Sequence, residues 1–252
     1  MDQVPLCPVD ALILSALSYV HFEDLIPQGG GASISIGQAA QAYLDAPAAK
    51  RGRCRCEDDL KLLRALMEAP RFSALPLSHY EDQFIPEEET QFGALAISLP
   101  DGSAFLAFRG TDATLVGWKE DFNMSFMDTV PAQRAAADYA QRFAASFSGP
   151  LRLGGHSKGG NLSIFAAASL RPFGTGFWRY IALTVRALPP ICSPSPATRS
   201  CSPGFLPLCP SPRWWVCFWS ERSPTPWCEA PGWAFSSTTP TPGRCWGAAL
   251  WK

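Results

Sequence analysis

LRLGGHSKGGNLSIFAAASL, the stretch of residues 151–170, decides the fold. Leu151 to Leu153 predicts a short buried strand, and the alanine-rich run from Gly159 to Leu170 predicts a helix directly behind it. The turn between them is tight, because glycines at 155 and 159 remove side chains that would collide with the neighbouring strand and helix. The stretch therefore predicts a strand, a sharp turn and a helix in immediate succession.

The preceding sequence supplies further strands and helices. Phe92 to Leu99 and Ala104 to Phe108 are apolar runs separated by the turn signal Pro100-Asp101-Gly102, which indicates a hairpin or two neighbouring strands. Four helices are also expected: Val9 to Phe22 with Asp10 placed to cap its first turn, Ile36 to Leu44, Asp58 to Glu68, and one that opens at Val130-Pro131. Strands alternating with helices are typical of an α/β sheet.

The overall charge argues against polyanionic partners. A formal net charge of -1 over 252 residues gives no electrostatic reason to expect nucleic acid or an anionic membrane surface. The apolar run from Ala11 to Val20 is too short to span a bilayer, and Asp2 and Asp10 precede it instead of a basic segment. We expect a cytoplasmic protein with no signal peptide and no integral membrane segment.

The composition changes abruptly near residue 171. From Pro172 onward the chain holds 14 of its 24 prolines, eight of its nine tryptophans and six of its nine cysteines, but no aspartate or histidine. A linker would explain the prolines but not the tryptophans, because linkers avoid large exposed aromatic residues. We expect residues 8–171 to form the N-terminal part of a domain and residues 172–252 to be a largely disordered tail. Cys54 and Cys56 have no second pair at zinc-finger spacing, so no metal and no organic cofactor is expected.

Ser157 is the candidate nucleophile. Residues 155–159 match G-x-S-x-G at a strand-to-helix junction, where this motif holds the serine in a strained turn with its hydroxyl above the sheet. The helix directs backbone N–H groups at an oxyanion on a bound acyl group, so Lys158 is expected to contribute its backbone N–H. Thr111, shortly after the strand ending at Phe108, is the candidate second donor. Two alternatives stay open: the motif also occurs by chance in loops, and Thr111 can instead cap a helix.

No histidine follows Ser157 in the sequence. His21 and His79 precede the nucleophile, at an expected helix end and in an expected loop, and neither fits the chain order serine, aspartate, histidine. His156 adjoins Ser157, but adjacent residues at a tight turn point in different directions, so we expect it to be structural.

Three motifs together resemble the bacterial Mbeg-like hydrolases, a group similar to class 3 lipases. They are FRGTD at 108–112, GWKEDFN at 117–123 and GHSKGGNL at 155–162. The resemblance covers roughly residues 8 to 171 and implies a nucleophile at Ser157 with an oxyanion contribution near Thr111. It also implies the fold class, an α/β structure built as an incomplete α/β-hydrolase-type sheet with flanking helices.

The chain departs from this group after the nucleophile helix. The group carries a Tyr-Ser-Asn-Asp-Gly-Pro-Gly-Phe segment there and a later histidine, and both are missing here. Phe173 to Leu188 can be back-translated with freely chosen synonymous codons. Read one register over, those codons permit the sequence Val-Arg-Asp-Arg-Ile-Leu-Ala-Val-Tyr-Ser-x-Asp-Gly-Pro-Gly-Phe, which contains the missing segment. We therefore predict an out-of-frame tail that starts near Arg171 to Phe173.

Three functional hypotheses follow. The first is a serine hydrolase ancestry acting on an acyl ester, lipid-like in character, with Ser157 as nucleophile and the oxyanion held near Thr111 and Lys158. Because the downstream aspartate and histidine are missing, we expect the chain as written to be close to inactive. The alternatives are a non-catalytic binding module that keeps the hydrolase pocket and an acyltransferase, since the sequence does not distinguish water from an alcohol as acceptor. It also leaves the oligomeric state open.

Overall fold

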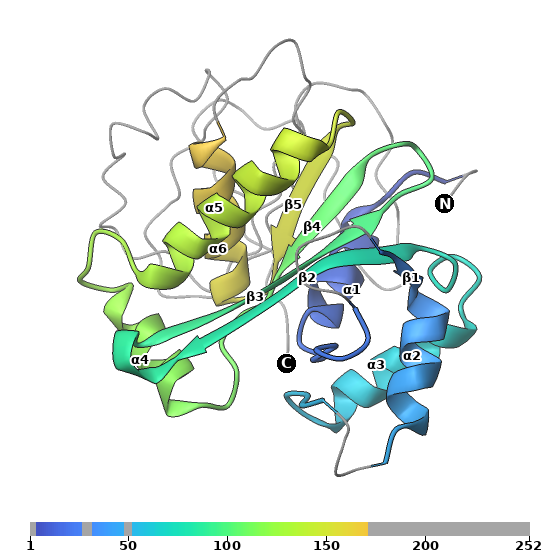
Figure 1. The fold of residues 1–252 in the computed structure, drawn as a ribbon, viewed down its shortest axis with the longest axis horizontal. Coiled ribbons are helices and arrows are strands. Elements are labelled where there is room, and N and C mark those ends of the chain that lie inside the picture. The colour runs from blue at the N-terminus through green and yellow to red at the C-terminus, as the bar shows by residue number, and fades with distance from the viewer. Residues whose placement is uncertain (1–3, 27–31, 48–51, 171–252) are drawn as a thin grey trace, which may run out of the picture.

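The computed structural model describes residues 4–26, 32–47 and 52–170 of the 252. The expected tail and the predicted change of frame lie outside these residues. The described chain forms one sheet with helices on both faces (Figure 1). In chain order the elements are α1 (Pro8–Leu17), β1 (Ile34–Ser35), α2 (Ile36–Asp45), α3 (Glu57–Glu68), β2 (Pro76–Ile85), η2 (Pro86–Glu88), β3 (Thr90–Ser98), β4 (Ala104–Phe108), α4 (Leu115–Asn123), α5 (Pro131–Ser146), β5 (Leu151–Gly155) and α6 (Lys158–Ser169). None of the helices in this part of the chain is long and apolar enough to cross a bilayer.

The five strands lie in the order β1-β2-β3-β4-β5. The first four pair antiparallel, whereas β4 and β5 are parallel. A parallel pair needs a crossover connection, and the segment that carries α4 and α5 supplies it. At the carboxyl ends of the parallel pair Phe108 faces Gly155. The segments that follow β4 and β5 therefore leave the sheet side by side.

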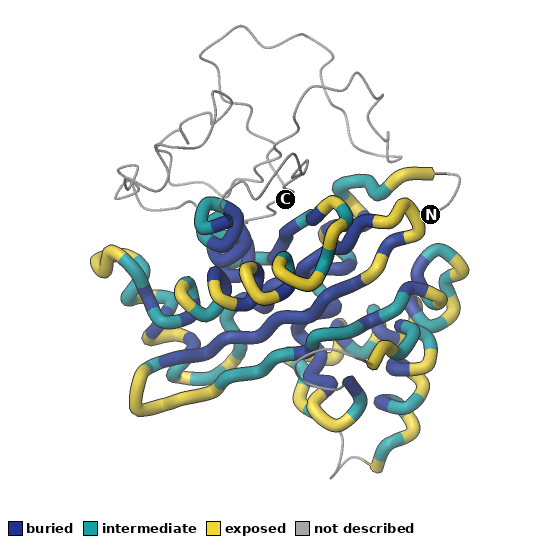
Figure 2. The backbone as a smooth tube through the Cα atoms, turned by 45° about the horizontal axis from the view of Figure 1, so that its top comes forward, coloured by how far each residue is buried: buried dark blue, intermediate teal, exposed yellow. Residues whose placement is uncertain are grey.

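The central strand β3 contributes to two separate hydrophobic cores. Leu95 and Ile97 face the core formed with α1, α2 and α3, while Ala94 and Ala96 face the core formed with α5 and α6. Both faces of the strand are therefore covered, which explains why its middle, from Phe92 to Ile97, has no polar alternation. Figure 2 shows the buried residues concentrated along the centre of the sheet. The expected incomplete α/β sheet with flanking helices is confirmed.

Most of the predicted elements are present. The apolar run Ala104 to Phe108 is β4 and pairs with β3 through the expected turn. The four later helices begin within one residue of their predicted starts, and the three whose ends were predicted end within one residue of them. The first helix is shorter than predicted and ends at Leu17. Asp10 does cap this helix, but from inside its first turn, where the carboxylate accepts a 2.8 Å hydrogen bond from the backbone N–H of Cys7.

Four elements were not predicted from the sequence: the two-residue strand β1, the short helix η2, the helix α4 and the strand β2. The strand β2 was concealed by its polar residues. The expectation that His79 lies in a loop is wrong: it lies within β2, with φ of 50°, where the pairing with β3 shifts register between Ser78 and Glu81. An irregularity of this kind interrupts the alternation of side chains on which a strand prediction depends.

Candidate active site

Ser157 occupies the corner between β5 and α6. Its φ of 58° and ψ of −125° lie outside the regions that residues with a side chain ordinarily adopt. Glycines make the corner sterically possible. A Cβ at Gly155 would collide with the backbone of Gly159, and a Cβ at Gly159 would collide with the carbonyl oxygen of Phe108. The strand, sharp turn and helix expected from the sequence are therefore present, and the turn is strained at the serine.

The segment that carries Thr111 passes directly beside this corner. It follows β4, and its Gly110 lies so close to the carbonyl oxygen of His156 that a Cβ would collide with that oxygen. The Thr111 hydroxyl is buried and has no hydrogen-bond partner among the described residues. The alternative that Thr111 caps a helix does not hold, because Thr114 caps α4 and accepts from the N–H of Gly117 at 3.1 Å. The structure thus brings the sequence-predicted residues to one edge of the sheet.

Lys158 is the first residue of α6, where backbone N–H groups lack acceptors within the helix. Its side chain points away from solvent and is completely buried. The ammonium donates at 2.7 Å to the backbone oxygen of Gln91, at 2.8 Å to Gln91 Oε1 and at 2.8 Å to Glu120 Oε2. Burial lowers the pKa of this ammonium, while the Glu120 carboxylate opposes the shift. All three donors are satisfied, so the side chain is a structural anchor and only the backbone N–H is left for an oxyanion.

These motifs can be compared with known protein families. Residues 66–173 match the model of the Mbeg1-like family. The resemblance drawn from the motifs is thereby confirmed over a segment that includes the strained serine, Thr111 and Lys158. No curated protein and no solved structure matches the chain. The family match ends at residue 173, where the sequence predicted the break to begin; the change of frame itself stays a prediction.

Glu120 is the buried partner of Lys158 and lies in the segment that matches the Mbeg1-like model. Its carboxylate accepts the hydrogen bond from the Lys158 ammonium. It also accepts hydrogen bonds from the backbone N–H of Gln91 at 3.1 Å and from that of Ala132 at 2.8 Å. One carboxylate on α4 therefore joins α6, the start of β3 and the first turn of α5. Sequence reasoning missed this residue, because a charged side chain in a helix is usually exposed and nothing in the local pattern identifies its partners.

The three histidines of the chain are engaged elsewhere. His156 lies beside Ser157, but its Nδ1 is 3.0 Å from the hydroxyl of Tyr19. Burial, and then the nearby charge of Arg55, lower the pKa of His156. His79 contacts Ser78 through Nδ1 at 2.9 Å and packs on the ring of Phe143, and burial lowers its pKa as well.

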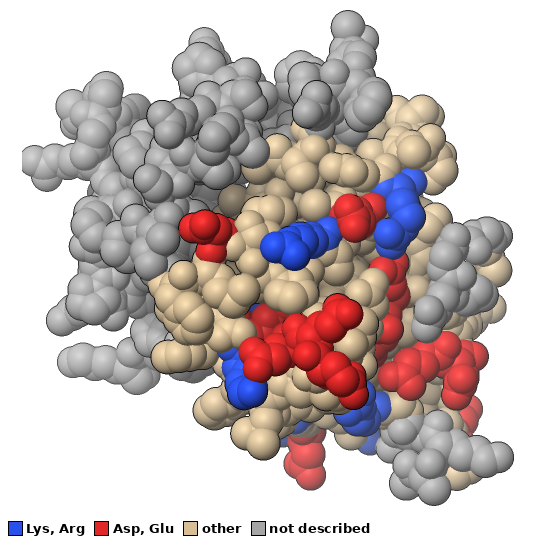
Figure 3. All heavy atoms as spheres, turned by 60° about the vertical axis from the view of Figure 1, so that its left-hand side comes forward, with Lys and Arg blue, Asp and Glu red and all other residues tan. Residues whose placement is uncertain are grey.

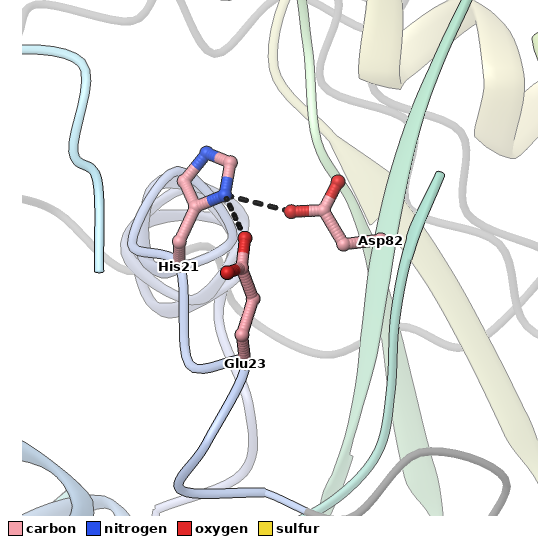
Figure 4. A group of neighbouring side chains, drawn as sticks. All are labelled: His21, Glu23 and Asp82. Atoms are coloured by element: carbon pink, nitrogen blue, oxygen red, sulfur yellow. Dashed lines mark hydrogen bonds and ion pairs between the residues drawn. The ribbon is translucent and has the colours of Figure 1, made fainter. Parts of the chain in front are cut away.

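His21 belongs to a cluster with Asp82 and Glu23, in which His21 is buried and Glu23 is exposed (Figure 4). Its Nδ1 lies 2.7 Å from Asp82 Oδ2 and 3.3 Å from Glu23 Oε1, so these three residues are spaced as metal ligands could be. The guanidinium of Arg109, however, pairs with both carboxylate oxygens of Asp82 and also contacts His21. A metal ion would have to share Asp82 with this fixed cation. We therefore describe the cluster as structural, holding the Arg109 end of β4 against β2 and the segment after α1.

The helix α4 carries its apolar side chains outward. Leu115, Trp118 and Phe122 are 84%, 67% and 69% exposed, whereas Glu120 is fully buried. A contiguous group of exposed apolar side chains marks a surface that meets an apolar ligand or partner. The helix begins shortly after Thr111, so this surface adjoins the candidate oxyanion residue.

Acidic side chains gather on the same end of the molecule. Figure 3 shows a cluster of them on the face that carries α4 in Figure 1. Glu87 and Glu88, at the tip of the β2–β3 hairpin, are exposed, and Glu89 accepts a bond from Lys119 of α4 at 2.7 Å. The field of this face favours uncharged or cationic ligands over anionic ones.

Proposed function

We propose that this chain carries the nucleophile half of a serine hydrolase that acts on carboxylic esters. Ser157 Oγ attacks the ester carbonyl carbon, and the resulting oxyanion is held by the backbone N–H of Lys158 and the hydroxyl of Thr111. The observation that carries the proposal is the positive φ of Ser157 at a corner between a buried strand and a helix. Such strain persists where function requires it, and here both flanking glycines permit it.

The attack also needs a base for the serine proton. No histidine follows Ser157, and the three earlier histidines contact other side chains. Without its base a serine triad keeps only the contribution of binding and the oxyanion hole, roughly a thousandfold to ten-thousandfold over water. The chain as written is therefore close to inactive. The acyl group can pass to water or to an alcohol, and the same site serves an acyltransferase.

The outward apolar face of α4 supports a lipid-like substrate. Trp118 and Phe122 offer an apolar surface next to the Thr111 segment, and the nearby carboxylates disfavour an anionic acyl group. A neutral ester with an apolar acyl chain fits both features. Nucleic acid fits neither, in keeping with the near-zero net charge.

Labelling with a fluorophosphonate tests the nucleophile. We expect slow labelling of Ser157 and a marked increase when imidazole is added, because free imidazole replaces the missing base. Ser157→Ala should abolish both reactions. Ser169→Ala, at the other end of the same helix, is the matched control and should label like the parent. A chain that stays unlabelled at Ser157 even with imidazole overturns the proposal and favours the non-catalytic binding module.

The nucleotide sequence tests the origin of the missing base. We expect the codons for residues 172–188, read one register over, to encode the Tyr-Ser-x-Asp-Gly-Pro-Gly-Phe segment and to continue to a histidine. Restoring that frame should then raise labelling without imidazole. Codons that encode no such segment in either other register contradict the change of frame and leave the assignment of Ser157 untouched.

A further inference from the structure

Gln91 lies where the nucleophile corner, the Thr111 segment and α4 meet. It is the second residue of β3 and is 1% exposed. Its Oε1 accepts the 2.8 Å bond from Lys158 Nζ, and its Nε2 donates to the backbone oxygen of Gly110 at 3.5 Å, the longest contact of the group. A Cβ added to Gly117 of α4 would lie 3.0 Å from the same Oε1, so the amide is wedged between all three segments.

We propose that Gln91 is a positioning residue that sets the separation between Ser157 and Thr111. Lys158 is the neighbour of the serine in sequence and Gly110 is the neighbour of the threonine, so the amide of Gln91 joins the two segments by one side chain. What those segments do chemically rests on the proposed function. The bridge itself rests on the contacts alone.

A carboxamide suits the chemistry of the bridge. The Lys158 ammonium offers only donors and the Gly110 carbonyl offers only an acceptor, so a link between them must accept at one end and donate at the other. A glutamate would satisfy the lysine but would turn a second acceptor toward the carbonyl. An apolar side chain of the same length would satisfy neither. Glutamine offers an acceptor to the ammonium and a donor to the carbonyl from one side chain.

The bridge can be cut without breaking the buried ion pair. In Gln91→Met the ammonium keeps the backbone oxygen of residue 91 and the carboxylate of Glu120, both of which lie outside the substituted side chain. Gln91→Asn serves as a second variant, because it keeps the amide but shortens its reach. Gln83→Met is the matched control: this glutamine lies on β2 and bonds Glu81 of its own strand.

Hydrogen exchange measured by mass spectrometry tests the bridge directly. The informative peptides span residues 109–117, where Thr114 donates its N–H to Asp112 Oδ1 at 2.9 Å and Gly117 donates to Thr114 Oγ1. We expect the exchange rate there to rise about threefold to tenfold in Gln91→Met, because that is the effect of losing one hydrogen bond. The rise should be smaller in Gln91→Asn. Peptides of α5 should change little. Unchanged exchange at 109–117, or an equal rise throughout the molecule, overturns the proposal.

Imidazole-assisted labelling of Ser157 gives a second readout. Across a range of probe concentrations we expect Gln91→Met to lower the maximal labelling rate by about tenfold while the half-saturating concentration stays close to that of the parent. A role confined to stability would instead lower the melting temperature and leave the labelling rate of the folded fraction unchanged. A parent chain that never labels contradicts the proposed function, and the exchange result still decides the role of Gln91.

Discussion

Lys158 Nζ lies 2.8 Å from Glu120 Oε2, and both side chains are fully removed from solvent. Removing the charge of one partner leaves the other buried without a counter-charge, which costs about 3–5 kcal/mol of folding free energy. We expect Glu120→Gln to lower the free energy of unfolding by about that amount in urea denaturation followed by circular dichroism. The exposed pair of Lys119 and Glu89 provides the control, because Glu89→Gln should cost less than about 1 kcal/mol. Equal effects of the two substitutions would contradict the anchoring role of Glu120.

The strain at Ser157 predicts opposite results for two small replacements. Glycine tolerates a φ of 58°, so Ser157→Gly should raise the free energy of unfolding by about 1 kcal/mol, even after the added freedom of the unfolded chain. Ser157→Ala keeps a Cβ and should leave the stability close to that of the parent. Both remove the nucleophile, so only the backbone distinguishes them. If glycine is the less stable of the two, the corner is not strained.

Asp82 should make the protein acid-sensitive. Burial would raise the pKa of this carboxyl, but hydrogen bonds from His21 and the charge of Arg109 outweigh it and hold the pKa well below its usual range. A carboxyl whose pKa is lower in the folded protein than in the unfolded chain stabilises the fold. This stabilisation is complete above the pKa of the unfolded chain, about 3.9 for aspartate, and is lost as the pH falls through the pKa of the folded protein. We expect Asp82→Asn to be less stable than the parent at neutral pH and to lose less stability on acidification below about pH 5.

The acid titration of the unfolding free energy measures this slope. Asp58→Asn is a suitable control, because Asp58 pairs with Lys61 on the surface, where both side chains are largely exposed. That substitution should leave the acid slope nearly unchanged. A parallel acid slope in the parent and Asp82→Asn would show that the His21–Asp82–Arg109 cluster does not govern acid stability.

The sequence predicted the elements whose signals are local. The corner at Ser157 could be anticipated because the glycines on either side belong to the same five residues, and β4 could be anticipated from one apolar run. The strand β2 could not, because Glu81 and Asp82 look like loop residues until Arg142 and Arg109 are known to pair with them. A pattern of polar residues carries no information about partners that are distant in sequence.

In the candidate site, too, the sequence predicted only the residues whose signals are local. Ser157 and Thr111 follow from motifs, whereas Gln91 and Glu120 could not be identified from the sequence, since each acts through segments far along the chain. The helix α4 reverses the usual pattern, with an acidic residue inside and aromatic residues outside, and so an argument from hydrophobic periodicity would assign its buried face wrongly. Rules of periodicity assume that apolar side chains face the core, and they fail where a surface is apolar.

Replacing Thr111 distinguishes an effect on stability from an effect on catalysis. Thr111→Val keeps the shape of the side chain and removes a buried oxygen that has no hydrogen-bond partner among the described residues. The free energy of unfolding should therefore stay the same or rise slightly. If the hydroxyl holds the oxyanion, the imidazole-assisted labelling of Ser157 should fall by about a hundredfold, the usual effect of losing one such donor.

Thr114→Val is the control that makes this result specific. Thr114 is three residues away and its hydroxyl caps α4, so its loss should cost about 1 kcal/mol of stability. Its effect on the labelling rate should be much smaller, because this hydroxyl is already bonded. A Thr111→Val chain that labels as fast as the parent would leave the backbone N–H groups as the whole of the oxyanion site.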